Sequence, residues 1–176
     1  MEIPNAMSKT HDEFEGDKKG QWSAPSKDAY LDQVAAMIRD HGWAIQGVFA
    51  TETSDQRWDF AYTVGLIQRG CSTELLMTGI PMNAAASILN EIAASFMNTG
   101  EKIPPSEYTL SNGYVLKTVS YVPRQGSDIH LGVARAYYDR PDVPVTQYVW
   151  PDQEHHYPWD EGWDGENYVQ PYGPTA

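Results

Sequence analysis

The sequence has a single cysteine, Cys71, so this chain of 176 residues cannot form an internal disulfide bond. It also lacks any apolar run near the ~20 residues that a membrane-spanning helix requires. No positively charged segment followed by an apolar one opens the chain, as a secretory signal would. We therefore expect a cytoplasmic protein with no membrane role.

Positive charge is scarce and is missing from one end of the chain. The 12 Lys and Arg residues face 24 Asp and Glu residues, which gives a net charge of -12. After Arg140 there are seven Asp or Glu residues and no Lys or Arg. Such an end repels phosphate backbones and anionic lipid. The densest basic stretch, Lys18-Lys19, is flanked by Asp17, so the sequence argues against direct nucleic-acid binding.

The usual signatures of cofactor, metal and nucleotide sites are absent as well. No GxGxxG stands at a strand–helix junction and no Gly-Lys-Ser/Thr follows a glycine-rich loop, which excludes P-loop chemistry. The neighbours His155 and His156 would point to opposite sides of an extended segment, so they are poorly placed to share one ion. We predict no metal and no cofactor.

A nucleophilic cysteine has little support in the sequence. Cys71 lies in a Gly-Cys-Ser loop without a local catalytic motif, although His41 or His130 is a conceivable base for it. A lone cysteine is more often a small buried hydrophobic residue. The sequence therefore identifies no catalytic residue.

What the chain does contain is a regular series of helix and strand patterns. Apolar residues spaced i, i+3, i+4 and i+7 predict a helix over 27–40, with Ser26 as its N-cap and Gly42 at its end. A second apolar stripe predicts a helix over 83–98, and a third helix is expected near 129–138. Strands are predicted by period-two alternation or compact apolar runs over 43–49, 58–64, 74–78, 108–110, 114–122 and 143–150.

The order of these elements predicts the fold class. Asn112-Gly113 separates two strand patterns and favours a tight hairpin, because both residues tolerate positive φ. The order α-β-β-β-α-β-β-α-β has more hairpins than crossovers, which is typical of an α+β domain on a mainly antiparallel sheet. We expect a mobile N-terminal arm over 1–25, then one α+β domain over 26–176 with about three helices and an extended aromatic C-terminal strap.

The strap begins with the run WPDQEHHYPWDEGW, residues 150–163, which holds three tryptophans, two histidines and four carboxylates. In one interpretation Trp150, Tyr157 and Trp159 bury their rings over the edge of the core. In another, the rings stack on a flat ligand or cap a cation, and Asp152 and Asp160 accept the donors of the ligand from the rim. Both interpretations can hold together, with rings as wall and carboxylates as rim.

These observations lead to a functional hypothesis and two rivals. We predict a non-enzymatic domain that binds a small molecule or a protein partner in a cleft between the strap and the strand carrying Tyr62 and Thr63. One rival is a hydrolase or transferase that uses carboxylate and histidine acid–base chemistry in the strap. The other is an acidic phage-type inhibitor of a host protein. The candidate ligand-binding residues are Tyr62, Thr63, Trp150, Asp152, His155, Tyr157, Trp159 and Asp160.

Several sequence blocks, in this order, resemble a known family. They are GWAIQGV, FAYTVGL, ELLMTGIP, ILNEIA, ARAYYD, VTQYVWPD, YPWDEGW and a late QP. Together they resemble the bacterial and phage family called domain of unknown function 4262, over roughly residues 42–171. The resemblance implies a shared α+β fold and a cytosolic bacterial or phage setting, and it assigns no activity and no catalytic residue.

Overall fold

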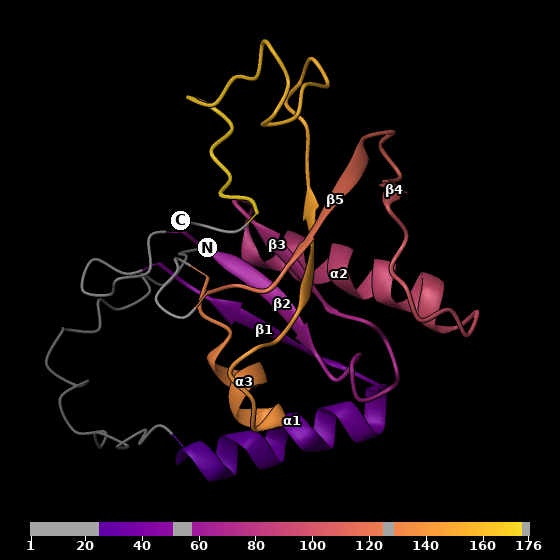
Figure 1. Ribbon diagram of the computed structural model, residues 1–176, viewed down its shortest axis with the longest axis vertical. Coiled ribbons are helices and arrows are strands. Elements are labelled where there is room, and N and C mark those ends of the chain that lie inside the picture. The colour runs from indigo at the N-terminus through magenta and orange to yellow at the C-terminus, as the bar shows by residue number, and fades with distance from the viewer. Residues whose placement is uncertain (1–24, 51–57, 125–128, 174–176) are drawn as a thin grey trace, which may run out of the picture.

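The computed structural model describes residues 25–50, 58–124 and 129–173. The predicted N-terminal arm lies outside these residues except for Pro25. The described elements follow the predicted order (Figure 1). They are α1 (Lys27–His41), β1 (Ala44–Val48), β2 (Phe60–Val64), β3 (Glu74–Thr78), α2 (Met82–Met97), β4 (Glu107–Thr109), β5 (Val115–Tyr121), α3 (Gly132–Tyr138) and β6 (Val145–Val149).

Six strands form one mixed sheet in the order β1-β2-β3-β6-β5-β4. Each neighbouring pair is antiparallel except β3 and β6, which run parallel at the centre of the sheet. The sheet therefore joins the meander β1-β2-β3 to the later strands through a single parallel pairing. This confirms the predicted α+β fold with a mainly antiparallel sheet and three helices.

The predicted start and stop signals are found where the sequence placed them. The Ser26 hydroxyl accepts a hydrogen bond from the backbone N–H of Ala29 (3.2 Å), and Gly42 ends α1 with φ of 98°. In the hairpin, the Leu110 N–H donates to the Tyr114 carbonyl (2.8 Å) across the turn at Asn112-Gly113. The third helix starts later than predicted, because Leu131 has the non-helical angles φ −88° and ψ 47°.

The sheet separates two apolar cores, because successive side chains of a strand point to opposite faces. Helix α2 covers one face, and α1 and α3 pack together on the other (Figure 1). The α2 face buries Ala61, Leu75, Met77, Leu116 and Tyr148 against the helix. The opposite core includes Phe60, Tyr62, Val64, Leu76 and Val145. Residues that alternate along β2 and β3 thus belong to different cores.

We predict that Gly79→Ala destabilises the protein much more than Gly100→Ala. Both glycines have positive φ (75° and 81°), so alanine costs roughly 1–2 kcal/mol in left-handed strain at either position. At Gly79 a Cβ would also lie 2.6 Å from the Val169 carbonyl oxygen, whereas at Gly100 it would meet nothing within 4 Å.

Urea denaturation of both variants checks this prediction. The loss in unfolding free energy should be larger for Gly79→Ala by about 1–3 kcal/mol, the cost of forcing the C-terminal segment away from the end of β3. Equal losses would show that this contact does not constrain the native state.

Candidate functional site

The strap, residues 150–163, is anchored at its first residue. Trp150 follows β6 directly, and its ring lies on the same face as Tyr148, against the α2 core. The indole Nε1 donates to the carbonyl of Thr78 at the end of β3 (2.9 Å). The Gln170 side chain accepts from the Trp150 N–H (3.2 Å) and donates to its carbonyl. These bonds fix the direction in which the strap leaves the sheet.

Asp152 organises the next part of the strap. Its Oδ1 accepts from the backbone N–H groups of Glu154 (2.9 Å) and His156 (2.8 Å), and its Oδ2 accepts from that of Asp164 (3.2 Å). The residue is only 3% exposed. Burial by itself disfavours the charge, but these three N–H donors outweigh burial and lower the pKa of the Asp152 carboxyl. Asp152 is therefore an ionised hub of the loop and not a free rim carboxylate as expected.

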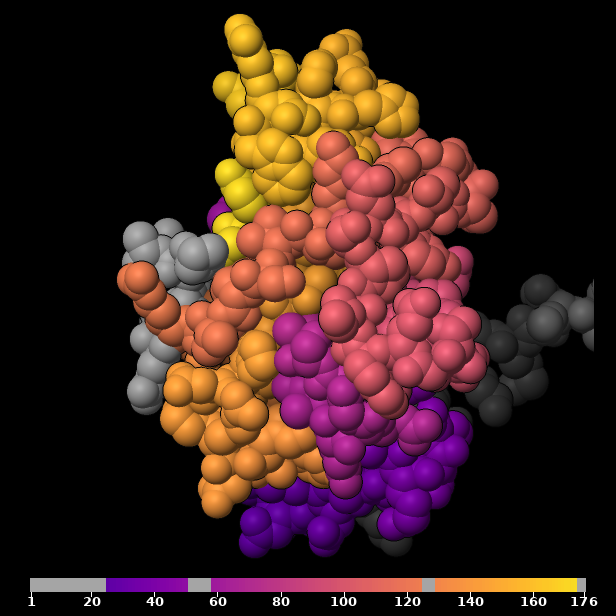
Figure 2. Space-filling view, turned by 45° about the vertical axis from the view of Figure 1, so that its right-hand side comes forward, coloured from indigo at the N-terminus to yellow at the C-terminus, as the bar shows by residue number. Residues whose placement is uncertain are grey.

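An apolar cleft of about 300 Å³ lies between the strap, α2 and the β4–β5 hairpin. Figure 2 shows the strap in yellow and orange at the top of the molecule, directly against the hairpin. The main apolar side chains of the lining come from these elements and from β3 and the residues just after it: Met77, Ile80, Ile88, Leu110, Leu116 and Trp150. The remaining lining residues are Asn112, Tyr114, Pro151, Asp152, Gln153 and Tyr168. The cleft extends the core on the α2 face to the surface.

A second cavity of about 310 Å³ adjoins the apolar cleft. Its lining is polar and includes Asp152, Glu154 and Asp164, together with Gly162. Three residues, Asp152, Gln153 and Tyr168, line both cavities. The two cavities therefore meet at these three residues, with an apolar lining on one side and an acidic lining on the other.

The later residues of the strap lie on the opposite face of β5. Lys117 follows Leu116 in the strand and so points away from the cleft, and its Nζ lies 4.2 Å above the Tyr157 ring. The Tyr157 hydroxyl donates to the Val115 carbonyl (2.7 Å), and Trp159 stacks on Tyr157 with 5.3 Å between the ring centroids. Trp159 is 42% exposed, so the expectation that its ring is buried was wrong.

Comparison with known proteins places the chain in a family. Residues 37–164 match the family described as Domain of unknown function (DUF4262). The chain belongs to this family. The match confirms the resemblance seen in the sequence blocks. No curated protein and no solved structure matches the chain. Within the residues that the structure describes, this DUF4262 protein has no helix that is long and apolar enough to cross a membrane.

The structure divides the predicted ligand-binding residues of this DUF4262 domain into three groups. Trp150 and Asp152 line the apolar cleft, and His155 stacks on Tyr114 at its edge with 5.0 Å between the centroids. Tyr157 and Trp159 lie on the other face of β5, and the Asp160 carboxylate accepts from the Tyr157 N–H (2.9 Å). The third group is Tyr62 and Thr63.

The prediction that Tyr62 and Thr63 border the cleft was wrong. Tyr62 is buried in the core beneath α1 and α3, where its hydroxyl accepts from the Val133 N–H (3.2 Å). Thr63 is fully buried and donates to the Glu74 carboxylate (2.6 Å). The cleft takes its other walls from α2 and the hairpin, which no local sequence pattern connects to the strap. The cleft residues that were not predicted from the sequence include Ile80, Ile88, Leu110, Tyr114, Leu116 and Tyr168.

Two other candidate chemistries find little support in the geometry. Cys71 is buried in the core on the α2 face, and burial raises the pKa of its thiol, which disfavours a reactive thiolate. In the described ranges, no group of three or more His, Cys, Asp or Glu side chains is placed to hold a metal ion.

A second buried carboxylate, that of Glu74, lies at the start of β3. It is fully buried, and it accepts hydrogen bonds from the Gly65 N–H (3.1 Å), the Ile67 N–H (3.1 Å), the Tyr138 hydroxyl and Thr63. Burial raises the pKa of Glu74, and these donors only partly offset it. The side chain ties α3 to the loop between β2 and β3, so its role is structural.

We predict that Asp152→Asn lowers the melting temperature clearly, whereas Asp160→Asn barely changes it. The amide introduced at position 152 would set an N–H donor against one of the three backbone donors that the carboxylate now satisfies. Asp160 is exposed and accepts a single backbone N–H, which an amide oxygen can also accept. Thermal unfolding followed by circular dichroism measures both variants; equal melting temperatures would refute the hub role of Asp152.

Glu74→Gln should change how stability depends on pH. Because the folded pKa of Glu74 is raised, its protonated form favours folding below the unfolded pKa, and this contribution is lost as pH rises through the folded pKa. Glutamine has no proton to lose. Relative to the wild type, Glu74→Gln should therefore become more stable as pH increases from about 4 to about 8. Urea denaturation across that range tests the prediction, and a pH-independent difference between the proteins contradicts it.

Proposed function

We propose that this protein is a non-enzymatic, cytoplasmic binding domain whose ligand is a small molecule with an apolar body. The observation that supports this most is the cleft of about 300 Å³ with an apolar floor and aromatic walls. Small-molecule sites in proteins are concave, mostly apolar and roughly 300–1,000 Å³ in volume, with a few polar groups that orient the ligand. The cleft combines these features with Asp152 and Gln153 at one side.

The walls of the cleft are held in place without a ligand. Trp150 is fixed to Thr78 by its indole N–H, and the hairpin wall is closed by the bond from Leu110 to Tyr114. Ile88 belongs to α2, whose apolar stripe is packed on the sheet. A site with walls ordered in advance needs less ordering on binding, which favours affinity for a small ligand.

The arrangement of the strap supports binding over acid–base catalysis. Asp152 has a lowered pKa and is a poor proton donor near neutral pH. Asp160 belongs with Tyr157 on the other face of β5, and His155 stacks on Tyr114. Of the three groups that a hydrolase or transferase would draw on, Asp152 lines the cleft and His155 lies at its edge, but Asp160 lies on the other face of β5, so the three do not form one acid–base set.

The same geometry weighs against an acidic inhibitor and against a folded protein partner. An acidic inhibitor of a host protein needs outward carboxylates on one broad face, and Asp152, whose oxygens turn inward to backbone N–H groups, does not contribute to such a face. A folded protein partner typically covers a broad surface of roughly 800 Å² on each side. A small concave site is better matched to a small molecule.

A neutral apolar dye, N-phenyl-1-naphthylamine, tests the proposal. We expect the dye to bind the wild type with saturable fluorescence, and Ile88→Gln to weaken binding by about fivefold or more through loss of apolar contact in the cleft. Ile103→Gln is the matched control, since Ile103 is 72% exposed and does not line the cleft.

Circular dichroism should show both isoleucine variants folded before their dye affinities are compared. Equal weakening by the two substitutions, or no saturable binding by the wild type, would refute the cleft as a ligand site.

A further inference from the structure

Building on the proposed function, we propose that the ligand is an organic cation, with its apolar body in the cleft and its charged nitrogen in the adjoining acidic cavity. The two cavities share Asp152, Gln153 and Tyr168. A ligand seated against Trp150 and Leu116 therefore meets the acidic cavity at its polar end. The inference concerns the chemistry of that end.

Charge complementarity selects a cation over an anion. Asp152, Glu154 and Asp164 line the acidic cavity, and no Lys or Arg is among the described residues that line either cavity. The sequence supplies no Lys or Arg after Arg140, so the strap and the segment that follows it place no permanent positive charge beside these carboxylates; the nearest basic group is the imidazole of His156, whose Nδ1 lies 3.5 Å from Asp152 Oδ2. Placing an anion here would add like charge to a partly enclosed site, which is unfavourable.

Tyr168 belongs to the lining shared by both cavities and Trp150 to the lining of the apolar cleft, and their rings add a second attraction for a cation. The rings of Trp150, Trp163 and Tyr168 form a cluster, with centroids 6.1 Å apart for Trp150–Trp163 and 5.9 Å for Trp150–Tyr168. The faces of such rings attract ammonium and guanidinium groups. The strap already holds a cation in this way on its other side, where Lys117 lies over Tyr157.

Three matched probes test the charge preference: 1-naphthylmethylamine, 1-naphthylmethanol and 1-naphthoate. They share the naphthalene body and differ in bearing a positive, neutral or negative group. Isothermal titration should show the amine binding about tenfold more tightly than the alcohol, with the carboxylate weakest. Added salt should weaken the amine and leave the alcohol unchanged.

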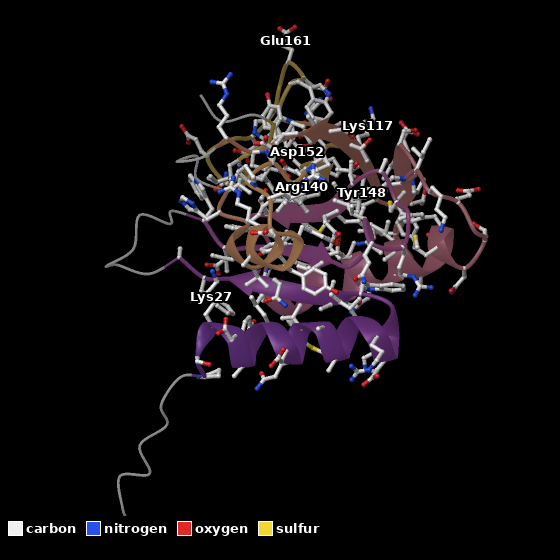
Figure 3. The ribbon with its side chains drawn as sticks, turned by 60° about the horizontal axis from the view of Figure 1, so that its bottom comes forward. Lys27, Lys117, Arg140, Tyr148, Asp152 and Glu161 are labelled. Carbon is white, nitrogen blue, oxygen red and sulfur yellow. The ribbon has the colours of Figure 1, made fainter. Side chains whose placement is uncertain are left out.

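Two glutamates of the strap locate the charged end of the ligand. Glu154 is exposed and lines the acidic cavity. Glu161 is exposed as well, but it lies at the tip of the strap and points away from the body (Figure 3). Glu154→Gln should weaken the amine about two- to fivefold and spare the alcohol, as expected for one partly screened charge pair. Glu161→Gln removes the same net charge and should change neither affinity by as much as twofold.

The outcomes separate this inference from the function on which it rests. Equal binding of the amine and the alcohol would overturn the cation inference and leave the apolar cleft as a binding site. Absence of binding by all three probes would overturn both. A preference for the amine that Glu154→Gln and Glu161→Gln reduce equally would overturn the acidic cavity as the location of the charge, because it would reflect only the net charge of the protein.

Discussion

The parallel pairing of β3 with β6 determines where the walls of the cleft can lie. Glu74 pairs with Val145 and Leu76 with Gln147, so the carboxyl ends of the two strands reach the same end of the sheet. From there the chain continues into α2 after β3 and into the strap after β6. Because β5 runs antiparallel to β6, its first residues and the hairpin turn reach the same end. Three segments distant in sequence therefore meet at one place.

A single hydrogen bond converts this arrangement into a defined site. The Trp150 indole donates to the Thr78 carbonyl, which joins the first residue after β6 to the last residue of β3. Trp150 continues the alternation of β6, so its ring faces the α2 core and not the opposite one. The strap then turns at Asp152, whose carboxylate accepts hydrogen bonds from three backbone N–H groups. The floor of the cleft is thus set by strand geometry, and its acidic wall by one buried carboxylate.

Local patterns were sufficient to predict the elements but not their neighbours. The element order, the N-cap at Ser26 and the turn at Asn112-Gly113 depend on residues close in sequence, and the structure has all of them. The pairing of β3 with β6 joins segments about 70 residues apart, and no periodicity records it. The cleft depends on that pairing, so its α2 and hairpin walls were beyond a reading of local patterns.

Two errors about the site have different physical origins. Every residue of β2 is buried, so alternation could not tell which face carries a ligand site, and Tyr62 faces the core beneath α1 and α3. Asp152 was expected at the rim of the ligand site because a carboxylate between aromatic residues is usually exposed to solvent. Its actual partners are backbone N–H groups, which every sequence has and no pattern reveals.

The distribution of charge follows from the same arrangement of strands. The chain has no Lys or Arg after Arg140, and β6 carries this part of the chain to the end of the sheet where the cleft opens. Lys117 is the cation that β5 brings to this end, and its position one residue after Leu116 turns it to the opposite face, over Tyr157. Strand alternation therefore keeps the cleft free of that lysine. The apolar floor and the acidic wall beside it are therefore left without a neutralising lysine from β5.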